Sequence, residues 1–435
     1  MATADRRAWA DQVGFALVSA VVVVVGFLQG RASVVVPLGL LAGVADAGSL
    51  VLLNATVACL VFSTTLLLSA AVFFADVVRG DGGRAHPTTG PSVAAIVPIY
   101  GDAAVLDRSV GSLLASRYED LDVYVVCEPG DEPTVERARE LATAHERVHC
   151  LVNTDHPGSK AAAVNFAAQV ADEDYLGVFD ADERVHPEFV AAAVAGLDDA
   201  DLVQGRTLPR PDGLLENVVY YESVVLGYLT HRLLSALTGF RMATSNVLVM
   251  RREAFRRVGG YDPSMLTEDF NFAFRCYEEG VRVEERLEYP SEIEAAHTPT
   301  DWWGQRKRWM TGYAQVLHRR LEAVDPVGAP RTVVSLLICA GAILGNLFLL
   351  SLASQAAALA AAGAVGVLAL PVATVWVVCL GVRLIDARAG HVEGVGLGWL
   401  LVPVVAPLYS LAAIKGFVEY PLSWSGEWYR VTKQG

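Results

Sequence analysis

Residues 175–182 read YLGVFDAD, a short apolar run that ends in two carboxylates. The run is too short to cross a membrane, and its aromatic and β-branched side chains favour a buried strand. Similar apolar runs precede it at 93–99 and 123–127, and the residues between the runs have helical spacing. In folds where strands and helices alternate, ligands bind beyond the carboxyl ends of the strands, which is where Asp180 and Asp182 fall.

This alternation predicts a mostly parallel, Rossmann-like α/β sheet with helices on both faces. The expected strands are 93–99, 123–127, 149–152 and 175–179. The expected helices are 105–116, 134–144 and 159–171, and Pro187 is expected to open another at a first-turn position.

Long apolar runs flank this polar segment on both sides. Mean hydropathy is +0.38 and 53% of the 435 residues are hydrophobic, which is typical of an integral membrane protein. The runs predict about five spanning helices, at about 13–29, 50–74, 333–352, 358–380 and 395–414. Arginines at positions 6, 7, 79 and 84 predict that the polar segment faces the cytoplasm.

The chain is therefore expected to have three parts in a multi-pass protein of the cell membrane. Residues 1–90 form a transmembrane hairpin. Residues 91–324 form a cytosolic α/β domain that ends in an amphipathic interfacial helix, and residues 325–435 form a C-terminal transmembrane region with an aromatic tail.

Charge restricts the partners. The net charge of −14 makes nucleic acid an unsuitable partner. Arginine outnumbers lysine 30 to 4, and acidic excess with scarce lysine fits the proteome of a halophile. Coding DNA rich in G and C produces the same arginine bias, so both explanations remain open.

Two acidic motifs can carry chemistry. Asp180 and Asp182 can both reach one hard cation, Mg²⁺ or Mn²⁺, together with oxygens of a diphosphate. A solvated loop is the alternative, but the strand before and the helix expected after favour a metal site. Residues 267–269 read TED at the mouth of an expected helix, 270–279. Helix capping and a general-base role for Asp269 are compatible interpretations.

Residues 302–309 read WWGQRKRW and predict an amphipathic helix at the membrane surface. Gln305, Arg308 and Trp309 share one face of that helix, and this face suits a leaving diphosphate and a sugar ring. Lys160 stands at an expected helix start, where phosphate binds readily, although an ordinary surface lysine remains the alternative. Glu128 follows a strand and can contact a base or ribose, or serve as a turn residue.

Two other patterns are set aside. Residues 145–149 match the zinc-protease pattern HExxH, but the helix that should carry both histidines is expected to end near His145. The six cysteines form no CxxC pair and are expected to be reduced core residues.

Taken together, these motifs resemble the membrane-bound family 2 inverting glycosyltransferases, the group of cellulose, hyaluronan and chitin synthases. The resemblance covers about residues 91–324 and rests on DAD at 180–182, GGYD at 259–262, TED at 267–269 and QRKRW at 305–309. It implies a GT-A fold, a nucleotide-sugar donor that is usually a UDP-sugar, and a saccharide or lipid-linked acceptor.

The resemblance also implies site residues. Asp180 and Asp182 would bind the metal, and Asp269 would be the catalytic base. The residues implied for substrate binding are Tyr100, Glu128 and Lys160 toward the nucleotide, Asp180 and Glu268 beside the donor, Gln305 and Arg308 toward the diphosphate, and Trp309 toward the acceptor.

The sequence departs from the group at 241–246, RMATSN, where processive synthases commonly have FFxGS or FFxGT. We therefore expect a single metal-dependent, inverting transfer at the cytoplasmic face, which makes a cell-envelope polysaccharide or a glycolipid. A processive synthase that also exports its polymer is the alternative within the enzymes. An inactive membrane scaffold is the alternative outside them.

Overall fold

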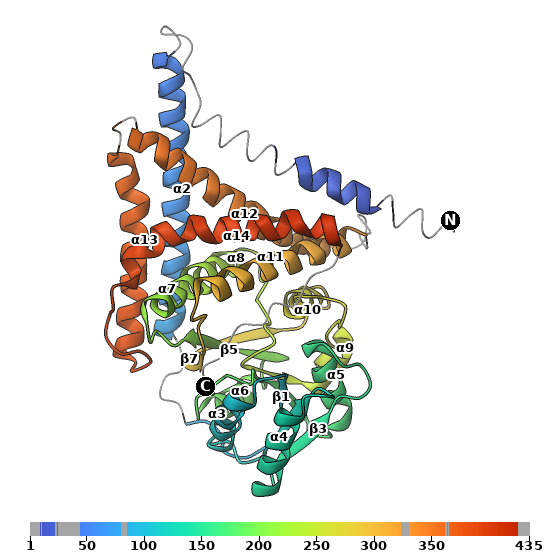
Figure 1. Cartoon of the computed structure of the whole chain (residues 1–435). Helices are drawn as coiled ribbons and strands as arrows, with labels where there is room; N and C mark the ends of the chain where they lie inside the picture. Colours follow the sequence, from blue (N-terminus) through green and yellow to red (C-terminus); the bar gives the residue numbers. More distant parts are fainter. Residues whose placement is uncertain are drawn as a thin grey trace. The chain divides into compact units, whose positions relative to one another are not determined.

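The computed structural model describes residues 9, 11–21, 24, 44–79, 85–322, 330–361, 363 and 365–424. The chain divides into two compact units, and each is described by itself. The sheet unit comprises Phe74–Arg210 and Leu237–Ala296, and the helical unit comprises Met1–Phe73, Pro211–Ala236 and His297–Val431 (Figure 1). The domain boundaries expected from the sequence stay a prediction.

The sheet unit is built on one seven-stranded sheet. Its strands are β1 (Val93–Ile99), β2 (Leu121–Cys127), β3 (Val148–Val152), β4 (Tyr175–Val178), β5 (Leu202–Pro209), β6 (Leu248–Arg251) and β7 (Val283–Ile293). The order across the sheet is β3-β2-β1-β4-β6-β5-β7, and only β6 among these strands runs antiparallel to its neighbours. The mostly parallel α/β sheet expected from the sequence is confirmed.

Helices cover both faces of this sheet. They are α3 (Ala103–Leu114), α4 (Glu132–Ala144), α5 (Lys160–Val170), α6 (Phe189–Gly196), α9 (Arg252–Val258) and α10 (Glu268–Glu278). Apolar side chains of α3, α4 and α6 share one core cluster with β1 and β2. The connection from β3 to β4 runs back across the sheet, so a right-handed crossover places α5 on the opposite face. Strands buried on both faces explain the continuous apolar runs in the sequence.

Strand register brings residues that are distant in the chain to the carboxyl-terminal edge of the sheet, which is the side where the parallel strands end. Ile99 at the end of β1 pairs with Cys127 at the end of β2. At the end of β4, Val178 pairs with Leu248, the first residue of antiparallel β6. The residues that follow β1, β2 and β4 therefore emerge at the same edge as the residues that precede β6.

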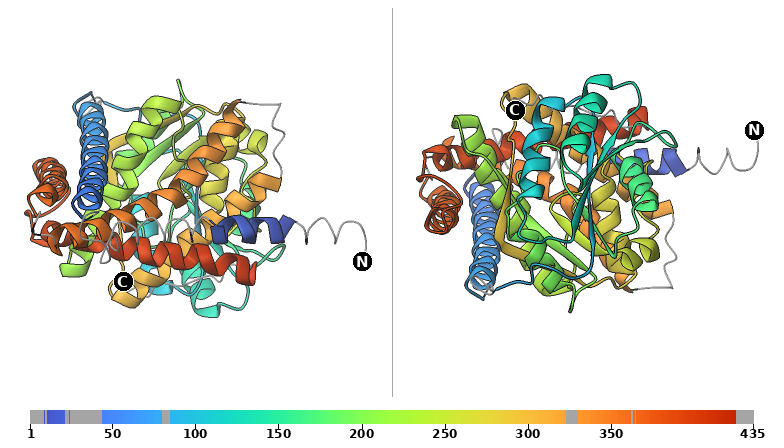
Figure 2. Two further views of the ribbon diagram at one scale, coloured as in Figure 1. Left: turned by 90° about the horizontal axis from the view of Figure 1, so that it is seen from above. Right: turned by 90° about the horizontal axis from the view of Figure 1, so that it is seen from below.

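The remaining helices supply the helical unit. They are α2 (Val44–Arg79), α7 (Leu214–Glu222), a π-helical segment (Ser223–Leu229), α8 (Thr230–Thr238), α11 (Pro299–Glu322), α12 (Pro330–Ala361), α13 (Gly366–Arg388), a 3₁₀ turn (Gly398–Leu401) and α14 (Val402–Ser423). Within this unit α11 packs against α14 and α12. Figures 1 and 2 show α11 and α14 running side by side, crosswise to α13.

Four stretches of the described residues are helical, long and apolar enough to cross a membrane: Ala55–Val78, Pro330–Ala361, Gly366–Arg388 and Gly398–Ser423. Large apolar side chains on them face outward, such as Val61, Leu337 and Val377, which are 51%, 67% and 64% exposed. Outward apolar surface of this kind suits contact with lipid.

The first span expected from the sequence, at about 13–29, is described only in part. The helix at this position, Asp11–Val21, is shorter than a span, and most of the residues after it lie outside the described part of the chain. The arginines at 6, 7 and 84 lie outside it as well. The orientation of the chain in a membrane stays a prediction.

Candidate active site

The edge of the sheet where β1, β2 and β4 end carries an ionic cluster. Lys160, the first residue of α5, forms an ion pair through Nζ with Oδ1 of Asp180. The other carboxylate oxygen of Asp180 accepts a hydrogen bond from Nδ2 of Asn246 at 3.2 Å. Asp180 is therefore held on one oxygen by a cation and on the other by an amide.

The turn that carries both aspartates is fixed by two further hydrogen bonds. Ser109 Oγ donates to the carbonyl oxygen of Asp180 at 3.0 Å, and the backbone N–H of Asp180 donates to Oε2 of Glu183 at 3.0 Å. Burial, followed by the charge of Asp180, raises the pKa of Glu183 well above its ordinary value. Asp182 remains partly exposed in this turn. Sequence reasoning missed Glu183, although it is a third carboxylate in the same short run.

The second acidic motif lies in the first turn of α10, which begins at Glu268, two residues earlier than expected. Oδ1 of Asp269 accepts a hydrogen bond from the backbone N–H of Phe270 at 2.7 Å. Glu268 is buried, and Oε1 accepts a hydrogen bond from Ser245 Oγ at 3.0 Å. Burial, followed by the charge of Asp269, raises the pKa of Glu268 to about 7.

Residues 245–247 connect the two acidic motifs. Ser245 bonds Glu268 of the second motif, and Asn246 bonds Asp180 of the first. Val247 follows with a φ of 42°, a backbone conformation that is strained for a β-branched residue. Such strain is found where surrounding contacts impose a geometry, often at functional sites. The sequence marked this segment only as a departure from the synthase pattern, so the roles of Ser245 and Asn246 were missed.

The carboxylates of both acidic motifs influence the pKa of Lys160. Burial alone would lower the pKa of Lys160, but the carboxylates of Asp180 and Glu268 outweigh it and raise the pKa above its ordinary value. The charge of Asp269 acts on the same ammonium in the same direction. The structure therefore brings together four residues expected from the sequence: Lys160, Asp180, Glu268 and Asp269.

Glu128 supports the segment that leads into α5. Its Oε1 accepts a hydrogen bond from Asn153 Nδ2 at 3.1 Å, and its Oε2 accepts one from the backbone N–H of Gly158 at 2.6 Å. Each carboxylate oxygen of Glu128 therefore has a partner within the protein. These two bonds hold residues 153–158, the segment that leads to Lys160. Tyr100, directly after β1, is 61% exposed at the same edge of the sheet. A nucleotide contact by either residue stays a prediction.

The residues at this edge suit a divalent cation. Asp180 and Asp182 offer carboxylate oxygens, the ligands that Mg²⁺ and Mn²⁺ prefer. Asp269 adds negative charge, and Glu268, whose pKa is raised to about 7, adds more where it is ionised. Two carboxylates do not complete the coordination shell of such a cation, and oxygens of a diphosphate would fill it.

Gln305, Arg308 and Trp309 lie on α11 in the helical unit, so their meeting with the acidic motifs stays a prediction. Within its own unit, this part of α11 is anchored by a residue that the sequence did not single out. The buried Arg306 donates to the buried carboxylate of Glu222 from Nε at 2.8 Å and from Nη2 at 3.2 Å.

The same arginine contacts two members of the motif directly. Arg306 donates from Nη1 to the amide oxygen of Gln305, and its guanidinium lies 4.8 Å from the ring centroid of Trp309. Trp302 Nε1 completes the group by donating to Glu222 at 2.6 Å. Glu222 lies at the end of α7, eighty residues before Trp302 in the chain, so local sequence patterns could not reveal the pairing.

Two expectations about neighbouring segments are resolved. The HExxH pattern is excluded as a zinc site, because α4 ends at Ala144, His145 has an extended backbone and His149 lies in β3. The expectation for Pro187 is wrong: α6 begins at Phe189, after Glu188 at the N-cap. Residues 187 and 188 form a turn, and the carbonyl oxygen of Pro187 accepts a hydrogen bond from the backbone N–H of Arg117 at 3.0 Å.

Known proteins are similar to parts of this chain in sequence, and one solved structure is similar to it in fold. The family described as glycosyl transferase family group 2 matches residues 176–382. A probable glycosyltransferase of Bacillus subtilis is 24% identical over 52% of this chain and 56% of its own length. A beta-monoglucosyldiacylglycerol synthase of Trichormus variabilis is 23% identical, over 51% of this chain and 49% of its own.

A poly-beta-1,6-N-acetyl-D-glucosamine synthase of Staphylococcus aureus is 22% identical, over 52% of this chain and 55% of its own. The chain spans about half the length of the curated relatives it matches. Among solved structures, a mannosyltransferase from Pyrobaculum calidifontis in complex with GDP-Man and Mn²⁺ is similar with a TM-score of 0.50. That likeness has 20% identity and covers 85% of this chain and 99% of the other.

The mostly parallel sheet with acidic motifs at the carboxyl ends of its strands defines a GT-A-like domain, with apolar helices before and after it. Over residues 176–382 the chain matches the glycosyltransferase family 2 group, and its homologues include membrane synthases.

Proposed function

We propose that this protein transfers a sugar from a nucleoside-diphosphate donor to a hydroxyl of a saccharide or lipid-linked acceptor, with inversion, at the cytoplasmic face of a membrane. The observation that supports this most is the meeting of Lys160 with carboxylates of both acidic motifs at one sheet edge. A surface loop or a helix cap would not need a half-buried lysine together with carboxylates from two distant segments.

In the proposed reaction, a lone pair of the acceptor hydroxyl forms the bond to the anomeric carbon as the bond from that carbon to the diphosphate oxygen breaks. Attack opposite the leaving group inverts the configuration. Asp269 removes the hydroxyl proton, and Trp309 holds the acceptor sugar. Lys160 and Arg308 supply positive charge to the departing diphosphate.

Asp180 and Asp182 would hold Mg²⁺ or Mn²⁺, which supplies further positive charge to the diphosphate when it is bound. The likeness to a mannosyltransferase solved with Mn²⁺ supports this assignment. The carboxylate of Asp180 would contact both the metal and Lys160, so replacing Asp180 would disturb the ion pair as well. Replacing Asp182 should weaken metal binding without disturbing that ion pair.

The donor and acceptor are proposed from the relatives. The resemblance to membrane synthases favours a UDP-sugar, and the likeness to a protein solved with GDP-Man makes GDP-mannose the second candidate. A diacylglycerol glucosyltransferase and a polymer synthase among the relatives support lipid and saccharide acceptors respectively. The outward apolar side chains of α2, α12 and α13 support a membrane setting.

The test is a screen of UDP- and GDP-sugars with the full chain in detergent or lipid nanodiscs, measuring free nucleoside diphosphate with and without Mn²⁺ or Mg²⁺. We expect release with one donor class and a metal. Asp182→Asn should lose metal-dependent release. Asp269→Asn should lower transfer by about 100-fold or more while donor binding survives. No release with any donor would instead support the inactive scaffold.

A processive synthase remains the second candidate, because one relative makes a polymer. Labelled donor and gel analysis distinguish the two activities. A single added sugar supports our proposal, and a ladder of long products supports the processive synthase.

A further inference from the structure

A second group of possible metal ligands lies in the helical unit. His318, near the end of α11, is only 5% exposed and is enclosed by aromatic rings. Its ring centroid lies 4.5 Å from that of Phe15, 5.8 Å from that of Tyr420 and 5.2 Å from that of Trp424. Packing of this kind fixes the plane of the imidazole, so its two nitrogens point in set directions.

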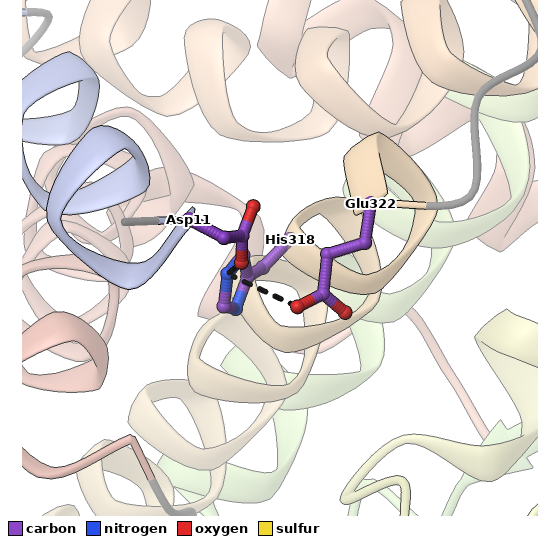
Figure 3. A group of neighbouring side chains, drawn as sticks. All are labelled: Asp11, His318 and Glu322. Carbon is purple, nitrogen blue, oxygen red and sulfur yellow. Dashed lines mark hydrogen bonds and ion pairs between the residues drawn. The ribbon is translucent and has the colours of Figure 1, made fainter. Parts of the chain in front are cut away.

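Each imidazole nitrogen has a different partner. Nδ1 lies 2.8 Å from the hydroxyl oxygen of Tyr420. Nε2 lies 2.6 Å from Oδ2 of Asp11 and 4.0 Å from Oε1 of Glu322. Figure 3 shows Asp11 and Glu322 directed toward the same side of the imidazole. One ligand atom from each of these three residues lies within 4.8 Å of the others.

We propose that Asp11, His318 and Glu322 bind a divalent transition-metal ion of the zinc class. Bonds of 2.0–2.2 Å in a tetrahedral site place neighbouring ligand atoms about 3.3 Å apart. The separations of 2.6 Å and 4.0 Å from Nε2 lie on either side of this value. Shifts of less than about 1 Å would therefore admit the ion. Glu322 is exposed, so water can take the fourth position.

The partner of the second imidazole nitrogen supports this assignment. Histidines that bind metal usually donate their other N–H to an oxygen, which fixes the tautomer and the ring. The hydroxyl of Tyr420 is placed to accept such a bond from Nδ1 of His318, so the lone pair of Nε2, which faces Asp11 at 2.6 Å, would be available to the ion. Within the part of the chain that the structure describes, no other trio of His, Cys, Asp or Glu brings its ligand atoms this close.

The ligand set also separates this site from the one at the sheet edge. Imidazole suits Zn²⁺ and its neighbours in the transition series, whereas carboxylates alone suit Mg²⁺ and Mn²⁺.

A bound ion would also have a structural consequence, because its ligands come from two different helices. Asp11 belongs to the helix Asp11–Val21, and the other ligands belong to the last turns of α11. A bound ion would join two segments that Phe15 already brings into apolar contact with Met310 and Ala314.

The test uses Co²⁺ as a spectroscopic substitute for Zn²⁺ on the full-length protein in detergent, purified without a histidine tag and stripped with EDTA. Tetrahedral Co²⁺ absorbs strongly in the visible range, whereas Co²⁺ in a six-coordinate oxygen site absorbs weakly. We expect strong bands at one equivalent of Co²⁺ and their loss on addition of Zn²⁺. Asp11→Asn and Glu322→Gln should each weaken binding by about 10-fold or more.

The matched control is Asp122→Asn, which removes the single carboxylate 3.2 Å from His149 and should leave the bands unchanged. Zn²⁺ should also slow hydrogen exchange in residues 11–21 of the wild type but not of Glu322→Gln. Glu322 is exposed, so that variant should fold normally. The absence of strong bands in the wild type overturns the proposal, and so does their persistence in both variants.

Discussion

The ammonium group of Lys160 interacts with the carboxylates at the sheet edge and partly balances their negative charge. Removing it in Lys160→Met leaves Asp180 without its ion pair and removes a cation from the proposed diphosphate site. We expect transfer to fall by about 100-fold, because a preorganised charge near a leaving group is worth that much. Donor binding and turnover, measured separately by titration and by diphosphate release, check this expectation.

The matched control is Lys415→Met. Lys415 pairs with the half-buried Glu419 at 3.2 Å, and Glu419 keeps a second partner, Lys307 at 3.0 Å, when Lys415 is replaced. Unchanged activity in Lys160→Met, or an equal loss in both variants, would contradict a role for Lys160 in the transfer reaction.

Glu268 should make the stability of the protein depend on pH. Its folded pKa of about 7 is raised above the ordinary 4.5 by burial and then by Asp269. The neutral form is thus favoured in the fold, so the stabilising contribution is full below pH 4.5 and is lost as pH rises to 7. Glu268→Gln mimics the neutral form and should escape this loss, which is on the order of 3 kcal/mol.

Melting temperatures of both proteins between pH 4.5 and 8 give the measurement, and the window follows from the two pKa values. The variant should match the wild type at the acidic end and exceed it above pH 7. A difference between the two proteins that stays constant across this range would contradict the assigned pKa.

Among the helices, the contact between α11 and α14 depends on a glycine. A methyl group added at Gly416 of α14 would clash with the carbonyl oxygen of Lys307 and approach the side chain of Thr311. Thr311 Oγ1 also lies 3.3 Å from the carbonyl oxygen of Gly416. Gly416→Ala should destabilise the helical unit by about 1–3 kcal/mol, because backbone atoms of two helices cannot easily yield.

Thermal unfolding followed by tryptophan fluorescence measures this effect. Gly341→Ala in α12 is the matched control, since a methyl group there meets open space. It should be neutral or slightly stabilising, because alanine favours helix. If the two substitutions had equal effects, close packing at Gly416 would not be the cause.

The elements that could be predicted are those with a strong local pattern. The strand expected at 93–99 is β1, because buried parallel strands are continuously apolar. Lys160 was expected at a helix start, and Ser159 provides the cap because its Oγ accepts a hydrogen bond from the backbone N–H of Ala162 at 3.1 Å. Antiparallel β6 could not be foreseen, since pairing direction depends on residues far away in the chain.

The same distinction holds within the candidate site. Asp180, Glu268 and Asp269 were predictable because charged residues interrupt apolar patterns at the ends of elements. Glu222 gave no such signal, because its importance comes from Arg306, which lies 84 positions later. Long-range pairing of buried polar groups is a property of the fold and not of any local window.

At the scale of the whole molecule, the chain carries a large excess of acidic charge. The chain contains 48 acidic and 34 basic residues, which gives the net charge of −14. Repulsion among like charges destabilises a compact state, and salt screens it over a Debye length of about 10 Å at 0.1 M and about 3 Å at 1 M. The melting temperature should therefore rise by roughly 3 °C or more between 0.1 and 1 M KCl.

The halophile interpretation and the coding-bias interpretation differ in this experiment. Adaptation to salt requires that stability increase with KCl, whereas a bias toward arginine codons alone requires no such dependence. Sucrose at matched osmolality is the control, because it is excluded from protein surfaces without screening charge. If KCl and sucrose raise the melting temperature equally, screening is not the cause. A rise with KCl alone supports repulsion among carboxylates as the factor that salt relieves.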